Sequence, residues 1–600
     1  MNFARPELRG THGAVASTNW LASGVAMAVL EREGNAFDAA VAAGFVLQVV
    51  EPHFNGPGGD VSIVAHRAGT EDAVAVCGQG PMPMAATPER FAELGLDQIP
   101  GSGLLPACVP GAMGAWLRLL AEFGTKRLAE VLAPAIGYAE SGFPVLPEMA
   151  RAIETMSPLF NTEWPSSAQV YLPHGAAPPA GSRFSNPMLA ETYRRLLGEA
   201  EAASADREEQ LGAAHRAFYE GFAAEAIDKF VSAGPVLDAT GRRNPGLLTG
   251  QDLAGWRPEV DRALHQPYRG VDVFKPGPWS QGPVFAQQLA LLEGFPLGDM
   301  APYGAEHLHT VVECAKLAFA DREAWYGDPA FTDVPMDVLL SAEYNERRRS
   351  LVTGSANHEF RPGAVGGRVP RVPERPPQQE IPAADAEWLR QLGNGLPTVV
   401  ELSNTRNDTC SVTVADRYGN MVAAVPSGGW LKSSPVIPGL GFSLGTRGQT
   451  MHLAGGHPNS LEPGKRPRTT LSPTVVLREG NPVLAFGTPG GDQQDQYTLE
   501  FFLAVIDFGL DLQAAVEAPT FRTGQVPSSF VPHEFHPGFL SLESGCSQEV
   551  FDELRRRGHV AEPGPEFSMG KVCAVGTDLH NELLLAAASP RGRQPYAVCR

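Results

Sequence analysis

The stretch Asn407-Asp408-Thr409-Cys410-Ser411-Val412 decides the fold that this sequence implies. It places a small hydroxyl residue, Thr409, at the first position of a predicted β-strand. A threonine hydroxyl is a weak nucleophile unless a base lies within hydrogen-bond reach, and the residue's own free α-amine is one such base. That amine exists only if the chain is cut between Asp408 and Thr409. Spacing alone does not separate this interpretation from a far commoner one, in which a strand-opening threonine is structural.

The sequence differs in character on the two sides of this stretch. Residues from about 355 to 397 are rich in proline and show no apolar periodicity. Because proline fixes φ and removes a donor, we expect an exposed linker there rather than an element. After the stretch the sequence is β-rich, with turn residues at 416–420 and 478–481 that are typical of hairpins. The strands are predicted at 410–415, 421–425, 474–477 and 483–486.

The part before the linker is predicted to be mainly helical, above all between residues 110 and 350. A turn-rich segment at 51–60 interrupts it and leads into a predicted strand at 61–65. The first helix has Ser17 or Thr18 available as its N-cap. Apolar residues at helical spacing predict helices at 21–29, 37–49, 112–123 and 305–325. The plan is therefore a helical part, a proline-rich linker and a β-rich part.

The composition limits the class of protein. A length of 600 residues exceeds one ordinary core, so two or more domains, or one unusually large one, are expected. A hydrophobic content of 43% suffices for a buried core and excludes wholesale disorder. The 47 basic and 67 acidic side chains give a net charge of −20. This charge argues against nucleic acid and anionic membranes as partners, because their phosphates would repel the chain.

The sequence predicts neither a membrane span nor an export signal. No apolar run reaches the ~18 residues that a transmembrane helix needs. The start of the chain lacks the apolar core of a signal peptide. The 7 cysteines are scattered, odd in number and never in a CxxC pair. Because a disulfide framework and a zinc ribbon are therefore both disfavoured, a reducing cytoplasm is the expected location.

Several segments, taken in order, resemble those of one enzyme family. They are Gly34-Asn35-Ala36-Phe37-Asp38-Ala39-Ala40, Val50-Glu51-Pro52-His53, Ala318-Phe319-Ala320-Asp321-Arg322, Gly327-Asp328-Pro329, Lys465-Arg466-Pro467-Arg468-Thr469-Thr470-Leu471-Ser472-Pro473-Thr474 and Gly487-Thr488-Pro489-Gly490-Gly491. On these segments the chain resembles the γ-glutamyltransferase family of the N-terminal-nucleophile (Ntn) hydrolase superfamily, from about residue 10 to the C-terminus. The resemblance implies an α/β fold of four layers. This αββα sandwich would hold two packed sheets covered by helices and be assembled from two self-cleaved segments.

The resemblance also implies a precursor that cleaves itself before Thr409. The Thr409 hydroxyl would attack the Asp408 carbonyl, and water would resolve the ester. The products, 1–408 and 409–600, would remain associated as large and small subunits. Thr409 would then be the catalytic nucleophile with its α-amine as base, and Ser427 matches a family threonine that supports it by hydrogen bonding. Cleavage would also explain the linker, because the new C-terminus at Asp408 must move out of the active site.

Two further segments match the family's substrate site. Gly490 and Gly491 stand where the family places an oxyanion hole, whose backbone N–H groups face the developing alkoxide. Glycine permits that close approach, although such a turn taken alone is more often only tight packing. Thr469 and Thr470 match two serines that hold the substrate's carboxylate. The resemblance thus implies substrate-binding roles for both, in a pocket narrowed by the added methyl groups.

The sequence departs from the family where γ-glutamyl groups are recognised. The family supplies an arginine for the α-carboxylate, yet no basic residue occurs here between Arg67 and Arg90. It also supplies acids for the α-ammonium, yet the 45 residues from 417 to 461 contain no Asp or Glu. An unpaired ammonium in a desolvated pocket is costly, so γ-glutamyl groups should bind poorly. Arg447 offers a planar fork suited to a carboxylate or oxo-acid, unless it is a solvent-facing turn residue.

No metal and no cofactor are expected. His307 and His309 lie two apart on a predicted helix and point to different sides, which favours structural roles. Glu51 and His53 are expected to hold the backbone of their turn rather than to perform acid–base chemistry. The expected partners are a small-molecule acyl substrate and the two self-cleaved chains for each other. A homodimer is left open.

The sequence therefore predicts a self-processing threonine-nucleophile hydrolase or acyltransferase. Its acyl donor would be an anionic or oxo-acid group rather than glutathione. The reaction would be amide hydrolysis or, in a biosynthetic pathway, C–C hydrolysis. The alternative within the class is a true γ-glutamyl hydrolase or transferase acting on glutathione or other γ-glutamyl amides. The alternative from another class is an unprocessed, non-catalytic homologue that acts as a binding protein.

Overall fold

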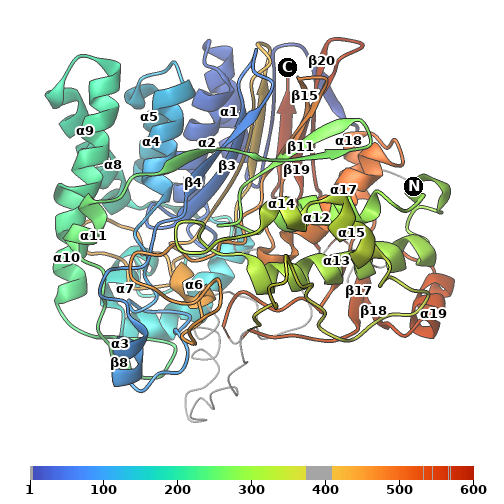
Figure 1. Ribbon diagram of the computed structural model, residues 1–600. Coiled ribbons are helices and arrows are strands. Elements are labelled where there is room, and N and C mark those ends of the chain that lie inside the picture. The colour runs from blue at the N-terminus through green and yellow to red at the C-terminus, as the bar shows by residue number, and fades with distance from the viewer. Residues whose placement is uncertain (1–4, 373–408, 532, 544, 565–566, 568) are drawn as a thin grey trace.

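The computed structural model describes residues 5–372, 409–531, 533–543, 545–564, 567 and 569–600 (Figure 1). Its centre is formed by two stacked sheets of seven antiparallel strands each. The first sheet has the order β1 (Leu8–Gly10), β20 (Leu583–Ala588), β19 (Cys573–Asp578), β15 (Asn481–Gly487), β14 (Thr474–Arg478), β11 (Val271–Lys275) and β10 (Leu264–Tyr268). The second has the order β21 (Tyr596–Cys599), β2 (Gly13–Ser17), β12 (Val412–Asp416), β13 (Met421–Ser427), β3 (Asp60–His66), β4 (Ala73–Gly78) and β9 (Glu259–Arg262).

Helices cover the outer face of each sheet (Figure 1). The second sheet is covered by α1 (Trp20–Glu31), α2 (Ala36–Val50), α4 (Ala112–Phe123), α5 (Leu128–Ser141), α8 (Pro187–Ala203) and α9 (Arg207–Tyr219). The first is covered by α12 (Gly282–Leu292), α13 (Ala305–Trp325), α17 (Gln494–Ile506) and α18 (Leu512–Glu517). Small apolar side chains such as Ala16, Ala423 and Ala485 fill the space between the sheets. These four layers confirm the predicted αββα sandwich.

Shorter elements complete the fold around this frame. The helices are α3 (Pro88–Glu93), α6 (Pro147–Thr162), α7 (Pro165–Tyr171), α10 (Phe222–Ser232), α11 (Gly250–Ala254), α14 (Met336–Leu339), α15 (Ala342–Arg349) and α19 (Gln548–Arg556). A three-stranded sheet is formed by β16 (Phe521–Thr523), β17 (Phe539–Glu543) and β18 (Val560–Gly564). Among the described helices, none combines the length and apolar character needed to cross a membrane.

Helix α2 anchors the segment that leads to the site. Asn35 and Asp38 form a capping box at its N-terminus, and all its residues are buried because it lies between the second sheet and other helices. A Cβ on its Gly44 would lie 2.5 Å from the ring of Trp116 on α4, so glycine is required for this approach. The tight packing fixes the end of α2 and hence the start of the turn-rich segment at 51–60.

Strands from both sides of residue 409 alternate within the sheets. In the second sheet β12 pairs with β2, and β13 pairs with β3. In the first sheet β14 pairs with β11, and β20 pairs with β1. The division into 1–408 and 409–600 stays a prediction, but each of the two seven-stranded sheets draws strands from both pieces.

Most predicted elements are present, including the mainly helical region at 110–350, and the expected N-cap of the first helix was wrong. Helix α1 begins after Asn19, whose side chain accepts the Leu21 N–H at 3.0 Å, so its N-cap is neither Ser17 nor Thr18. Residues 110–350 also hold β9, β10 and β11, and the chain passes there from one sheet to the other. Short strands exposed at a sheet edge lack the apolar alternation that would have predicted them.

The proline-rich linker is described as far as residue 372, and 373–397 lie outside the described residues. The described part holds no helix or strand longer than an isolated bridge, as expected. It is nevertheless not simply exposed. The Gly363 N–H donates to Asp321, the Gly363 carbonyl accepts from the Trp325 indole, and Val365 is buried. This part is therefore anchored on α13.

Candidate active site

Thr409 lies where the chain enters the second sheet, just before β12. It forms an isolated antiparallel bridge with Ser427, and the Cys410 N–H donates to the Pro426 carbonyl at 2.9 Å. The hydroxyl oxygens of Thr409 and Ser427 are 3.1 Å apart, and both side chains are buried. The structure thus brings Ser427 into hydrogen-bond contact with the predicted nucleophile. Asp408, on the other side of the predicted cleavage site, lies outside the described residues.

Cys410, the residue next to Thr409, is held by the segment that follows α2. Its Sγ lies 2.9 Å from Glu51 Oε2 and 3.1 Å from Asn55 Nδ2. Burial raises the pKa of Glu51, and hydrogen bonds from Cys410 and Thr18 oppose that shift. Because Glu51 also accepts from the Thr18 hydroxyl at 2.9 Å, it ties β2 to the start of β12. This geometry is consistent with the predicted structural role of Glu51.

The residue opposite Ser427 on β3 is Asp60, and it binds Arg447. Nε and Nη2 of Arg447 each lie 3.0 Å from one oxygen of the Asp60 carboxylate, and the two side chains are only 3% and 5% exposed. Such a bidentate pair is among the stronger polar contacts in proteins. Arg447 is therefore not a solvent-facing turn residue. The expectation that its whole fork is free for a substrate was wrong, because Asp60 occupies one side of it.

A run of glycines explains how an acid on β3 reaches Arg447. A Cβ on Gly58 would lie 2.1 Å from the Ser443 carbonyl oxygen, and a Cβ on Gly59 would lie 2.1 Å from that of Ser427. Only glycine permits backbones to approach so closely. The run thereby brings the segment with Arg447 against the start of β3. Sequence reasoning missed Asp60, and the crowding implied by these glycines was the signal that could have found it.

Two buried aromatic rings flank Arg447. The ring centroids of Trp430 and Phe530 lie 5.7 Å and 5.5 Å from its Cζ, within cation–π range. Among the described residues, the hydrogen bonds that Arg447 donates from its side chain come from Nε and Nη2, and none comes from Nη1. The guanidinium is therefore oriented by Asp60 and two rings, while its Nη1 group remains available to bind a ligand.

Gly490 and Gly491 form the turn between β15 and α17. Their φ angles of 138° and 55° lie in the region that favours glycine. Gly487, at the end of β15, packs against the strand of Thr409, since a Cβ there would lie 2.8 Å from Ser411 Oγ. Backbone N–H groups at the start of a helix are suited to a negative oxygen. The oxyanion role of this turn stays a prediction.

Thr469 and Thr470 differ in whether their hydroxyl groups have a hydrogen-bond partner. The Thr469 hydroxyl donates to Asp60 Oδ2 at 3.3 Å. The Thr470 hydroxyl is buried and has no partner among the residues that the structure describes. An unpaired buried hydroxyl is costly, so Thr470 is the better placed of the two to bind a ligand.

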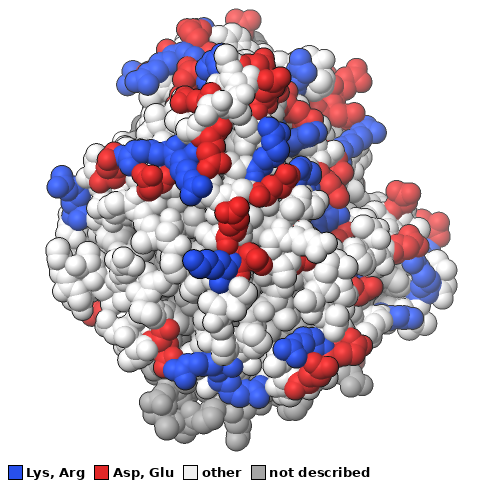
Figure 2. All heavy atoms as spheres, turned by 90° about the vertical axis from the view of Figure 1, so that its left-hand side faces the viewer, with Lys and Arg blue, Asp and Glu red and all other residues white. Residues whose placement is uncertain are grey.

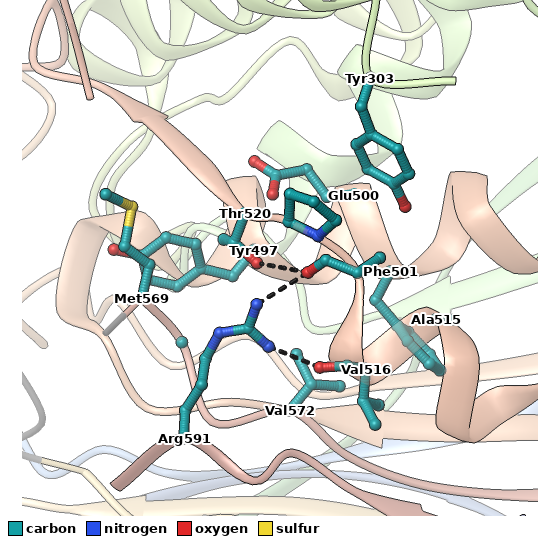
Figure 3. A pocket seen from close by; sticks show the side chains of 13 residues that line it. Tyr303, Tyr497, Glu500, Phe501, Ala515, Val516, Thr520, Met569, Val572 and Arg591 are labelled. Atoms are coloured by element: carbon teal, nitrogen blue, oxygen red, sulfur yellow. Dashed lines mark hydrogen bonds between the residues drawn. The ribbon is translucent and has the colours of Figure 1, made fainter. Parts of the chain in front are cut away.

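Figure 3 shows a separate polar pocket. Its lining includes Tyr497, Glu500 and Arg591 and none of the predicted site residues. Tyr497 links it to the turn, because a Cβ on Gly490 would lie 3.1 Å from its ring. Burial raises the pKa of Glu500 well above its usual value, and the charge of Glu543 raises it further. This pocket therefore holds a carboxyl group of raised pKa near the site but outside it.

The charged side chains do not gather into one large patch on the face shown in Figure 2, where basic and acidic groups are intermixed. Several exposed charges in the described helices pair one turn apart, such as Arg118 with Glu122 and Arg195 with Glu199. Exposed pairs of this kind contribute little to stability. The face offers no continuous basic stripe among its described residues, the feature by which a nucleic-acid-binding surface is recognised.

Two groups of three side chains have ligand atoms close enough to hold a metal ion. They are His309, Glu313 and His559, and Glu323, His452 and His457. In each group the carboxylate already binds two cations, which are Lys316 and Arg361 for Glu313, and Arg322 and Arg468 for Glu323. An added cation would compete with these partners, so internal ion pairing is the favoured role. The expectation that no metal is bound stays a prediction.

An αββα frame with a buried hydroxyl residue at the start of a central strand defines the class of N-terminal-nucleophile hydrolases. A comparison with protein families agrees, because the model described as gamma-glutamyltranspeptidase matches residues 22–599. The chain therefore belongs to the γ-glutamyltranspeptidase family.

Three relatives cover nearly the whole chain. The Acylase ACY 1 proenzyme of Pseudomonas sp. (strain SE83) is 30% identical over 98% of this chain and 94% of its own length. The Glutathione hydrolase-like YwrD proenzyme of Bacillus subtilis (strain 168) is 29% identical over 97% and 98%. The Oxamate amidohydrolase proenzyme of Klebsiella pneumoniae is 29% identical over 97% of both chains. The chain is accordingly an amidohydrolase or acyltransferase of the Ntn type.

Two solved structures share the fold over the whole chain. A structure of LmbA2991 is 50% identical, covers 100% of both chains and has a TM-score of 0.92. The cephalosporin acylase from Bacillus halodurans is 27% identical, covers 100% of this chain and 98% of its own, and has a TM-score of 0.81. The Ntn-hydrolase fold predicted from the sequence is thus confirmed by comparison as well as by topology.

Proposed function

We propose that the chain cleaves itself between Asp408 and Thr409 and then works as a threonine-nucleophile hydrolase. The observation that carries this proposal is the 3.1 Å contact between the hydroxyls of Thr409 and Ser427 at a buried strand end. In the intact chain Ser427 orients the Thr409 hydroxyl for attack on the Asp408 carbonyl, and water resolves the ester. The proenzyme names of the relatives support this step.

In the cleaved enzyme the Thr409 hydroxyl attacks the acyl carbon of the substrate. The free α-amine of Thr409 takes the hydroxyl proton and passes it to the leaving group. The Gly490 and Gly491 N–H groups stabilise the oxyanion, and loss of one such donor typically costs ~10²–10³ in rate. Water then attacks the ester on Thr409 and releases the acid.

The acyl donor in this proposal is an anionic or oxo-acid group rather than a γ-glutamyl group. The Asp60 carboxylate is already engaged by Arg447 and Thr469, so its charge is not available to an α-ammonium. Arg447 Nη1 and the Thr470 hydroxyl provide donors for substrate oxygens. Relatives named as an acylase and an oxamate amidohydrolase support this class of substrate, with amide or C–C hydrolysis as the reaction.

The alternative candidate is hydrolysis of glutathione or another γ-glutamyl amide. It is favoured by the relative named as glutathione hydrolase-like and by the presence of an acid, Asp60, next to Ser427. A γ-glutamyl anilide and oxamate, offered to the same preparation, distinguish the two. Brisk release of the aniline from the anilide, without turnover of oxamate, would favour this alternative.

Self-cleavage is tested on a denaturing gel. The wild type should give bands of about 43 kDa and about 20 kDa, the residue shares of a 63.9 kDa chain. Thr409→Ala should remain a single band, whereas Thr409→Ser, which keeps a hydroxyl, should still be cleaved. Thr413→Ala is the matched control, since Thr413 lies on the same strand and its hydroxyl bonds only to the Ala16 carbonyl among the described residues. A wild-type chain that stays intact would indicate the non-catalytic binding protein instead.

A further inference from the structure

A second group of polar side chains lies on segments that contact those of the proposed active site, and the mechanism above does not use it. His53 lies between Glu51 and Asn55, the two residues that hold Cys410. Its ring is buried, and neither ring nitrogen has a partner among the described residues. Buried polar groups are nearly always hydrogen-bonded, so these two nitrogens point to a ligand.

Lys432 belongs to the segment that follows Ser427, and this segment packs against the turn of His53. The backbone carbonyls on either side of His53 accept hydrogen bonds from the Leu431 N–H and the Trp430 indole, each at 2.9 Å. These bonds lay the segment against the turn that carries His53. Lys432 directly follows Leu431 and is buried.

Lys571 reaches the same place from the first sheet. Its Nζ lies 5.2 Å from the ring centroid of Phe54, which in turn lies 3.9 Å from the ring centroid of His53. The Lys571 N–H donates to the Thr488 hydroxyl at 2.9 Å, just before the glycine turn. Its acidic partner in the described part of the chain, Glu148, lies 3.1 Å away and is partly exposed.

The charges in this cluster favour an anion. Burial lowers the pKa of His53 well below its usual value, and the charges of Lys571 and Lys432 lower it further. The imidazole is therefore neutral near pH 7 and offers one N–H donor. Glu51, an acid in the same turn as His53, is already bonded to Cys410 and Thr18. Two ammonium groups and an imidazole donor fit a small carboxylate.

We propose that His53, Lys432 and Lys571 form the subsite that receives the carboxylate of the acyl group. The proposal rests on the function proposed above and names the residues that recognise the negative charge. Each of the three is joined to the catalytic apparatus, through Cys410, the Ser427 segment or Thr488. Arg447, whose charge is balanced by Asp60, adds a single hydrogen-bond donor, Nη1, to the recognition of the substrate's oxygens.

Oxamate and oxamide test this subsite because they differ only in a carboxylate against a carboxamide. We expect kcat/KM for oxamate to fall about 10- to 100-fold in Lys571→Met and in Lys432→Met, mainly through KM, while oxamide changes by less than about twofold. His53→Phe, which keeps a ring against Phe54, should show a smaller fall in the same direction. Lys465→Met is the matched control, since Lys465 is also 1% exposed and pairs with a partly exposed acid.

Oxalate provides a test that needs no turnover. Titrated calorimetrically into processed enzyme, it should bind the wild type and bind Lys571→Met at least about tenfold more weakly. Equal losses for the two amides, equal oxalate binding by both proteins, or no oxalate binding by the wild type would overturn the proposal. If neither amide is hydrolysed but oxalate binding depends on Lys571, the subsite stands and the proposed function fails. A two-band gel verifies each variant, and Lys571→Gln replaces Lys571→Met if the latter is not processed.

Discussion

Two buried arginine–carboxylate pairs lie near the glycine turn, and they differ in one donor. In the Arg591–Glu543 pair, Nε and Nη2 bind the carboxylate at 2.9 Å and 2.5 Å. The Arg591 fork also bonds to the carbonyls of Val516 and Ala518 at 2.5 Å and 2.7 Å, as Figure 3 shows for Val516. In the Arg447–Asp60 pair, Nε and Nη2 bind the carboxylate at 3.0 Å each, and Nη1 donates to no acceptor among the described residues.

The difference separates a structural arginine from one that is able to bind a ligand. Every nitrogen of Arg591 is used within the protein, so its removal affects folding. Arg447 is fixed by Asp60 and two aromatic rings, yet it keeps one donor for an incoming oxygen. Burial and ion pairing alone do not reveal this, because both arginines are almost fully buried.

The largest effect is expected from Arg591→Met, which breaks the saturated pair. It leaves Glu543 buried without its counter-ion, which typically costs about 3–5 kcal/mol of unfolding free energy. Urea titration of the processed enzyme measures this loss. Arg195→Met removes an exposed pair with Glu199 and should change the unfolding free energy by at most about 0.5 kcal/mol. Similar curves for the two variants would contradict a structural role for Arg591.

A smaller and different effect is expected from Arg447→Lys. Lysine keeps the charge beside Asp60 but loses the planar fork and with it the Nη1 donor. We expect kcat/KM for the anionic acyl substrate of the proposed function to fall about 10- to 100-fold, with little change in the melting temperature. Arg591→Lys should do the reverse, lowering the melting temperature while each folded molecule keeps its activity. The comparison fails if both lysine variants show the same profile.

The smallest effect concerns pH and is confined to the pocket of Arg591. The pKa of Glu500 is raised by burial, so the folded state keeps a proton that the unfolded state loses above its ordinary pKa of 4.5. Its stabilising contribution is therefore full below about pH 4.5 and is lost as the pH rises through the folded-state pKa. Compared with Glu500→Gln, the wild type should lose melting temperature progressively as the pH is raised from 4.5. Parallel pH profiles for the two proteins would exclude this contribution.

The elements that carry Thr409 were predictable because their pattern is local. The turn at 416–420 between two largely apolar runs predicts the hairpin of β12 and β13, which the structure contains. Apolar spacing likewise predicts α13 over the residues that form it. The four-layer arrangement was predicted only from the segments that resemble the family, because no local pattern specifies how sheets and helices stack.

The contact between Arg447 and Asp60 was not predictable in this way. The two residues are 387 positions apart, and their contact depends on the close approach of two backbones at glycines. Counting charges along one segment suggested an uncompensated positive site after Thr409. The compensating acid comes from β3, because sheet pairing places Asp60 opposite Ser427. Charge balance in a folded site is a property of neighbours in space.

The alternation of strands in the second sheet has a consequence for how pairs of subunits arise. β12 and β13 lie between β2 and β3, and β21 lies beside β2. A chain cut before Thr409 yields two pieces that were folded together, and exchanging either piece would require opening both sheets. Every active enzyme molecule would thus contain one large and one small piece that come from the same precursor chain. In a cell that makes two distinguishable versions of this protein, only the parental combinations would be found.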